Sequence, residues 1–346
     1  MSNTLNVILI GLGKMGQKWI HTIHENENVN CVGYVESNED LLIKVGEDYQ
    51  ISKDLLFSDL TTAAKNQKAD FVINVTPPSI HKEVSFIALG YGLHVLSEKP
   101  LADTMESAVD ILNYTNQTNL KYMISQDYRF NRGPRTILNY LINGNIGGLG
   151  AINLTFNRNP NFPPENFRLT QLDYPMIIDM SIHHFDLMRY FTKSNPTSIY
   201  TRSFNPKWSQ YSGDAAHSMI IEFDNLHVNY SASWCAIGPQ THRAGIWCFD
   251  GGKGTITWDG MEDLCFYNHN SSVANKSLPL VNMESTAQDY SLNEFISAIK
   301  NDREPECSIQ DNIQSLAMVF GAAESARRKE VVFFDEIMNS IKKGFN

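Results

Sequence analysis

The chain has 346 residues, of which 42% are hydrophobic and 19% charged, and its formal net charge is -10 at pH 7. A chain of this length is larger than one hydrophobic core usually supports, so two domains are expected. The balance of hydrophobic and charged residues is that of a globular protein. The negative balance argues against a nucleic-acid partner, because phosphate binding needs clustered Lys and Arg side chains. A small-molecule partner is expected instead.

The sequence predicts neither a membrane partner nor export. Residues 1–5 lead directly into an apolar strand pattern with no basic segment, which leaves no room for a secretory signal. No stretch approaches the roughly 18 uncharged apolar residues of a membrane span. The five cysteines are scattered, odd in number and without a CxxC pair: Cys31, Cys235, Cys248, Cys265 and Cys307. This usage predicts reduced thiols in a cytoplasmic protein and no metal site.

The first third alternates short apolar runs with amphipathic segments. The expected strands are Asn6–Ile10, Cys31–Val35, Phe71–Val75, Leu93–Leu96 and Lys121–Ile124. Helices are expected at Lys14–Glu25, from about Glu39 onward, and at Met105–Thr118. A further helix of about ten residues is expected between the strands Phe71–Val75 and Leu93–Leu96. Nearly continuous apolar strands that alternate with helices predict a doubly wound parallel sheet of the Rossmann type, covered on both faces.

The pattern changes after Gln126. A helix is expected over Pro134–Asn143, ending at Gly144, a residue suited to a left-handed cap. Longer, alternating strands then follow at Ala151–Phe156, Ser198–Phe204, Ser218–Phe223, His227–Trp234, Ile246–Phe249 and Thr255–Trp258, with helices at Gln288–Lys300 and Asp311–Arg328. Such a run predicts an α+β domain with a mainly antiparallel open sheet. We therefore expect an α/β protein with a dinucleotide-binding domain over residues 1–125 and a substrate-binding domain over residues 126–346.

A glycine-rich loop follows the first strand. Gly11, Gly13 and Gly16 form a GxGxxG sequence at the start of the first helix. The first glycine permits the tight turn, the second lets the backbone approach a pyrophosphate, and the third lets helix and strand pack closely. The helix N-terminus offers N–H groups and partial positive charge to the anion. The alternative is an ordinary glycine turn between strand and helix.

Glu36 bears on the choice of cofactor. It ends the second strand twenty positions after Gly16 (36 − 16 = 20), where a carboxylate can accept hydrogen bonds from the ribose hydroxyls. A carboxylate there repels a 2′-phosphate, and residues 37–40 offer no Arg to bind one. The sequence therefore favours NAD over NADP, unless Glu36 is an unrelated surface residue.

Several motifs resemble the glucose–fructose oxidoreductase, inositol dehydrogenase and rhizopine-catabolism (Gfo/Idh/MocA) family. Beyond the glycine loop, these are the segments Thr76–His81, His94–Pro100, Gln126–Phe130 and Asp179–Asp186, the second of which reads HVLSEKP and the last DMSIHHFD. They occur in the family's order. Two departures are Asp173–Met176, where the family has a glycine pair, and Ser181, where it often has glycine or alanine. The first departure concerns the shape of the pocket wall and the entry loop. The matching motifs together are specific for the family, but they are not specific for a substrate.

The resemblance implies a set of site residues. Cofactor contacts are expected from Gly11, Gly13, Lys14, Met15, Gly16, Glu36, Thr76, Pro77, His81, Glu98 and Lys99. The catalytic group would be Lys99, Asp179 and His183, with Asp179 orienting His183 or joining a proton relay. Substrate binding would add Arg129, Asn157 and Asp186 to these three. Members of the family commonly pair their second domains, so a homodimer or homotetramer through the C-terminal sheet is expected.

The residue types agree with that chemistry. Asp179, His183 and Asp186 stand at i, i+4 and i+7, so they share one face if the segment is helical. Oxidation of an alcohol by NAD needs a base for the hydroxyl proton, and an imidazole titrates near neutral pH. Lys99 can stabilise the developing alkoxide charge. Its bond to Pro100 is expected to be cis, and the alternative is an ordinary proline that ends the strand. A purely structural polar stripe is the alternative for this face.

These features predict hydride transfer between a nicotinamide and an alcohol carbon of a polyol, inositol or sugar-like substrate. One alternative is a redox-neutral glycoside hydrolase or epimerase-like enzyme that oxidises a sugar carbon transiently and reduces it again. Another is a non-catalytic regulator that senses NAD. The substrate and the direction of the reaction are not specified by these residues.

Overall fold

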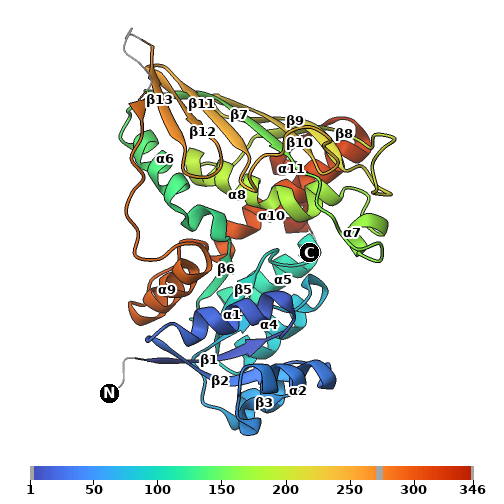
Figure 1. Cartoon of the computed structure of the whole chain (residues 1–346), viewed down its shortest axis with the longest axis vertical. Helices are drawn as coiled ribbons and strands as arrows, with labels where there is room; N and C mark the ends of the chain where they lie inside the picture. Colours follow the sequence, from blue (N-terminus) through green and yellow to red (C-terminus); the bar gives the residue numbers. More distant parts are fainter. Residues whose placement is uncertain (1–3, 270–275, 344–346) are drawn as a thin grey trace. The chain divides into compact units, whose positions relative to one another are not determined.

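The structure is a computed structural model that describes residues 4–269 and 276–343 (Figure 1). The chain folds into two compact units, Met1–Asp127 with Ser285–Ile313, and Tyr128–Glu284 with Gln314–Asn346. The expected division at residue 125 did not anticipate that residues 285–313 group with the first unit. Within the described residues, no helix has the length and apolar character that a bilayer span would require.

The first unit is a six-stranded parallel sheet in the order β3-β2-β1-β4-β5-β6. Its strands are β1 (Leu5–Ile10), β2 (Val29–Val35), β3 (Leu56–Phe57), β4 (Phe71–Asn74), β5 (His94–Glu98) and β6 (Tyr122–Ser125). Its helices are α1 (Lys14–His24), α2 (Glu39–Asp48), α3 (Leu60–Asn66), α4 (His81–Gly90), α5 (Met105–Asn116) and α9 (Ala287–Lys300). The predicted Rossmann topology is confirmed, and β3 and α3 are elements that the sequence pattern did not predict.

Burial explains the continuous apolar runs of this sheet. Val7, Ile8 and Leu9 of β1, and Phe71, Val72 and Ile73 of β4, are all fully buried, as expected for central parallel strands covered on both faces. Helix α9 packs on α1 through a hydrogen bond from the Thr22 hydroxyl to Asp289, with donor and acceptor 2.8 Å apart. Together with its contacts to β5 and β6, this contact places the late segment α9 in the first unit.

The second unit contains a nine-stranded mixed sheet in the order β14-β13-β12-β11-β7-β10-β9-β8-β15. The strands are β7 (Leu149–Asn157), β8 (Ser198–Phe204), β9 (Ala216–Phe223), β10 (Leu226–Ser233), β11 (Ile246–Gly251), β12 (Gly254–Trp258), β13 (Leu264–Asn268), β14 (Lys276–Ser277) and β15 (Val331–Phe333). Of the pairings between these strands only β7 with β10 is parallel, so the predicted mainly antiparallel sheet is confirmed.

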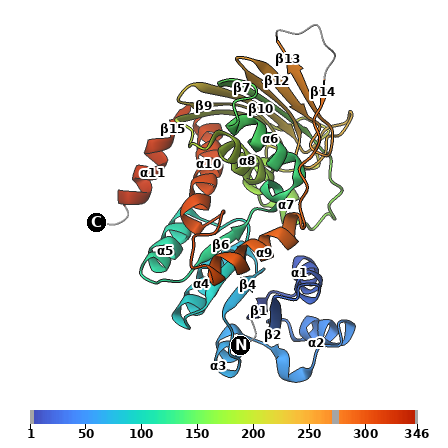
Figure 2. The same ribbon diagram turned by 90° about the vertical axis from the view of Figure 1, so that its left-hand side faces the viewer.

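Helices lie on one face of this sheet, as Figures 1 and 2 show for α6 and α8. The helices are α6 (Arg132–Ile142), α7 (Phe167–Thr170), α8 (Ser181–Thr192), α10 (Ile309–Arg328), which begins in the first unit, and α11 (Phe334–Lys343). Gly144 adopts the predicted left-handed conformation after α6, with φ +66°. In β9 and β10 buried and exposed residues alternate, which leaves the opposite face of the sheet open.

Candidate active site

The glycine loop has the geometry that a dinucleotide needs. Gly11 has φ +88°, and a Cβ atom there would lie 2.7 Å from the carbonyl oxygen of Val75. At Gly16 a Cβ atom would lie 1.9 Å from the carbonyl oxygen of Gly11, so only glycine allows this turn to pack on α1. Both positions require glycine for the reason that the motif predicts.

The N-terminus of α1 can accept a phosphate group. Gly13 is the N-cap residue, and among the described residues no side chain caps the first N–H groups of the helix. A Cβ atom at Gly13 would have no described neighbour within 4 Å, so the backbone faces open space there. Lys14 and Met15 follow as exposed residues, and the first turn contains no acidic side chain. Uncapped N–H groups, open space and a first turn without negative charge fit a bound pyrophosphate.

Glu36 lies directly beside this loop. Its Oε2 atom accepts a hydrogen bond of 2.9 Å from the backbone N–H of Leu12, and Oε1 accepts one of 3.0 Å from the backbone N–H of Asn38. The carboxylate therefore braces the glycine loop against the end of β2. Its remaining lone pairs can accept from ribose hydroxyls, as the sequence position predicts.

His81 joins the loops that follow β4 and β5. It is fully buried at the start of α4, with Nε2 2.9 Å from the carbonyl oxygen of Thr76 and Nδ1 2.9 Å from that of Pro100. Burial lowers the pKa of His81, while the hydrogen bonds to Thr76 and Pro100 oppose this effect. The imidazole thus binds the protein backbone, so a direct contact of its side chain with the cofactor stays a prediction, as it does for the partly exposed Thr76 and the exposed Pro77.

The segment Glu98–Pro100 ends β5 and begins the next loop. The Lys99–Pro100 peptide bond is cis, as predicted. The Glu98 carboxylate accepts a hydrogen bond of 2.8 Å from the indole N–H of Trp19. Burial raises the pKa of Glu98 to about 7, although Trp19, Lys99 and the Lys99 backbone N–H stabilise its charge. Lys99 therefore leaves the sheet next to a carboxyl group that titrates near neutral pH.

His183 lies in the first turn of α8, in the second unit. Only 7% of the residue is exposed, and the ring of Tyr128 stacks on the imidazole with centroids 4.2 Å apart and an interplanar angle of 11°. This parallel contact fixes the plane of the ring. Tyr128 is adjacent to Arg129 in a segment that the sequence motifs singled out, but no pattern in the sequence predicts the stacking.

Asp179 precedes α8 in a π-helical turn, Met176–Met180, which the sequence did not predict. Its carboxylate accepts hydrogen bonds from Nε of Arg168, at 2.7 Å, and from Nη2, at 3.2 Å. Arg168 comes from α7, eleven residues earlier (179 − 168 = 11). Because Asp179 lies in the π turn, its spacing to His183 is not that of a continuous α-helix. Such π turns are frequent at functional sites.

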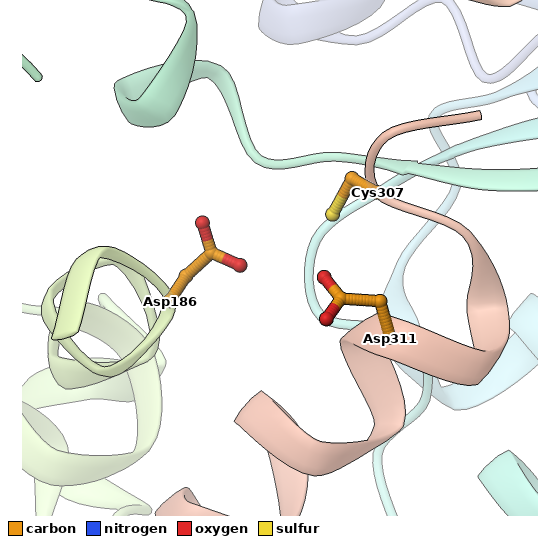
Figure 3. A group of neighbouring side chains, drawn as sticks. All are labelled: Asp186, Cys307 and Asp311. Carbon is orange, nitrogen blue, oxygen red and sulfur yellow. The ribbon is translucent and has the colours of Figure 1, made fainter. Parts of the chain in front are cut away.

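Arg129 and Asp186 form a buried ion pair. Nε of Arg129 donates to one carboxylate oxygen of Asp186 at 2.7 Å, and Nη2 donates to the other. Their side chains are only 5% and 1% exposed. Figure 3 draws Asp186 with Cys307 and Asp311; both oxygens of Asp186 accept hydrogen bonds from Arg129. The two side chains thus bind each other. This geometry gives no support to the predicted contacts of Arg129 and Asp186 with substrate hydroxyls.

Asn157, at the end of β7, and His184 of α8 have different surroundings. Asn157, a predicted substrate contact, ends β7 partly exposed, and its backbone N–H donates to the Thr241 hydroxyl at 3.1 Å. His184 is fully buried, with Nδ1 2.6 Å from the Tyr230 hydroxyl and Nε2 3.1 Å from the Arg243 carbonyl oxygen. Burial lowers the pKa of His184 to about 4, so this imidazole is neutral and structural.

The comparisons with known proteins agree with both units. A family model described as the oxidoreductase family with an NAD-binding Rossmann fold matches residues 5–126, and the GFO/IDH/MocA C-terminal domain model matches residues 135–256. The chain is 26% identical to the uncharacterized protein y4oX of Sinorhizobium fredii, over 99% of each chain. It is 20% identical to myo-inositol 2-dehydrogenase of Thermotoga maritima, over 96% of this chain and 100% of the relative.

A solved structure has the same fold over nearly the whole chain. It is an oxidoreductase from Agrobacterium radiobacter in complex with NAD+, L-tartaric acid and magnesium, with a TM-score of 0.85 at 17% identity, over 96% of this chain and 99% of the other. The two family models together cover most of the sequence, and the topology of each unit agrees with them. The chain therefore belongs to the GFO/IDH/MocA family and is an NAD-binding oxidoreductase.

Proposed function

We propose that this protein is a dehydrogenase that transfers a hydride between NAD and an alcohol carbon of a polyol, an inositol or a sugar-like molecule. The observation that carries the proposal is the imidazole of His183, held in a fixed plane by Tyr128, in a chain that also retains Lys99 after β5 of its NAD-binding unit. The myo-inositol 2-dehydrogenase among the relatives supports a polyhydroxylated substrate.

The proposed roles follow from the chemistry of each side chain. His183 accepts the hydroxyl proton when the alcohol is oxidised, and Lys99 stabilises the developing alkoxide charge. Bound NAD supplies the hydride acceptor. Asp179, bound by Arg168 in the π turn before His183, orients His183 or joins the proton relay. Asn157 is proposed to bind a substrate hydroxyl.

A panel assay tests this function. NADH fluorescence is followed while the protein is incubated with NAD and a series of polyols, inositols and free sugars. A signal with one class of substrate, with one NADH formed per oxidised product, supports the dehydrogenase. Binding of NAD without net NADH, but with conversion of a glycoside, would replace it by the redox-neutral alternative. Binding of NAD with no conversion of any compound would favour the regulator.

NAD is the proposed cofactor in preference to NADP, and Glu36 determines this preference. Glu36→Gln keeps an acceptor for the Leu12 N–H and removes the charge that repels a 2′-phosphate. We expect the ratio of the NADPH and NADH dissociation constants to fall by about 10-fold, measured by fluorescence titration. Glu39→Gln, an exposed carboxylate three residues further on, serves as the matched control. An unchanged ratio in Glu36→Gln would show that Glu36 does not select the cofactor.

A homodimer or homotetramer through the open face of the nine-stranded sheet is also proposed. Ile220 of β9 and Ile246 of β11 are each 48% exposed, and a hollow of about 360 Å³ lies on this sheet beside Tyr200 and Asn229. Ile220→Asp would place an unpaired charge in the interface, so we expect association to weaken by about 100-fold or more. Light scattering measures this, with Ile43→Asp on α2 as control. A monomeric wild type would refute the proposed assembly.

A further inference from the structure

Trp19 connects two parts of the first unit that the proposed chemistry uses. It is fully buried in α1, the helix whose N-terminus follows the glycine loop. Its indole N–H points at Glu98 and donates to the Oε1 atom at 2.8 Å. Glu98 ends β5 and immediately precedes Lys99. One hydrogen bond therefore joins the dinucleotide-binding helix to the segment that carries Lys99.

The surroundings of the Glu98 carboxylate make this bond important. Two donors stabilise its charge, the Trp19 indole and the backbone N–H of Lys99. The charged groups that act on it are Lys99, which favours ionisation, and Asp127, which opposes it. Residue 98 is partly exposed overall, but burial of its carboxyl group raises the pKa to about 7. Near neutral pH the charge next to Lys99 thus depends on a balance to which the Trp19 indole contributes directly.

We propose that Trp19 is a positioning residue for the reaction, because its indole N–H fixes the Glu98 carboxylate and thereby sets the charge beside Lys99. The inference deepens the proposed function and rests on it, since Lys99 is assigned there to the hydroxyl oxygen. A phenyl ring could fill much of the same space in α1 but could not donate this hydrogen bond.

The experiment compares the titration of Glu98 with and without the indole donor. Protein labelled with ¹³C at the glutamate carboxyl carbon is titrated by NMR, and Glu98→Gln identifies the resonance by its loss. In Trp19→Phe we expect the midpoint of Glu98 to rise by about one pH unit, a roughly tenfold change in its protonation ratio, because a donor to the ionised form has been removed. Trp247→Phe is the matched control, since Trp247 is equally buried and its indole donates to the Ala244 carbonyl oxygen instead.

The pH profile of kcat links the titration to turnover. A limb near pH 7 is expected to move upward in Trp19→Phe, to be absent in Glu98→Gln, and to stay in place in Trp247→Phe. If Trp19→Phe does not fold, benzothienylalanine at position 19 keeps the ring shape and replaces N–H by sulfur. An unchanged Glu98 midpoint in a folded variant overturns the inference. The NMR readout needs neither cofactor nor substrate, so its failure is distinguishable from failure of the proposed function in the NADH assay.

Discussion

Replacing His183 by asparagine lowers kcat by about 10²- to 10⁴-fold, the usual contribution of a positioned general base. Asparagine is polar and similar in size, but its amide cannot accept a proton near neutral pH. His183 belongs to the second unit and not to the NAD-binding unit. We therefore expect its replacement to change the dissociation constant for NAD by less than about threefold. Steady-state kinetics and NAD titration measure the two effects.

The control for this substitution is His227→Asn. His227 is on β10 with its side chain 67% exposed, so its loss should leave kcat unchanged. Added imidazole should partly restore turnover in His183→Gly, since the free base can occupy the space beside the Tyr128 ring. If His183→Asn retains wild-type kcat with the substrate from the panel, His183 is not the base.

Replacing Arg129 by methionine lowers the free energy of unfolding by about 3–5 kcal/mol, because the buried carboxylate of Asp186 loses its partner. The double variant Arg129→Met with Asp186→Leu should recover most of this loss, since an apolar pair leaves no unpaired charge. Urea denaturation followed by circular dichroism measures both. Substrate contact by the pair predicts a different result, in which KM rises and stability changes by less than about 1 kcal/mol.

Arg168→Met provides the comparison. Its ion pair with Asp179 is similar in geometry, but the two side chains are 25% and 21% exposed. Solvent screens such a pair, so we expect its loss to cost about 1 kcal/mol or less. Asp179 lies just before the turn of α8 that carries His183. This substitution should therefore lower kcat, although it changes the free energy of unfolding little. The two arginines therefore separate a structural ion pair from one that supports the reaction.

The sequence predicted the elements whose residues are determined by local pattern. The apolar runs of β1, β4 and β5 have to be buried on both faces, and the glycines at positions 11 and 16 have to form a turn where a Cβ atom clashes with backbone. Helix α9 was also predicted as a helix. Its membership of the first unit was not, because amphipathic periodicity gives the apolar face of a helix and not the surface that covers it.

The contacts inside the candidate site were less predictable. The pairing of Arg168 with Asp179 depends on the position of the short helix α7 in the folded chain. The π turn at Met176–Met180 changes the spacing between Asp179 and His183 from that of a continuous helix. The stacking of Tyr128 on His183 joins residues 55 positions apart (183 − 128 = 55). Such long-range side-chain contacts are determined by tertiary packing, and no local sequence pattern predicts them.

The most direct test of the proposed reaction follows the hydride itself. A substrate from the panel is prepared with deuterium on its alcohol carbons and incubated with NAD, and cofactor and product are analysed by mass spectrometry. We predict one deuterium in the reduced nicotinamide and a carbonyl product formed in equal amount, both abolished in His183→Asn. Deuterium recovered in a product of unchanged oxidation state, with no NADH released, would contradict the dehydrogenase and identify a redox-neutral enzyme.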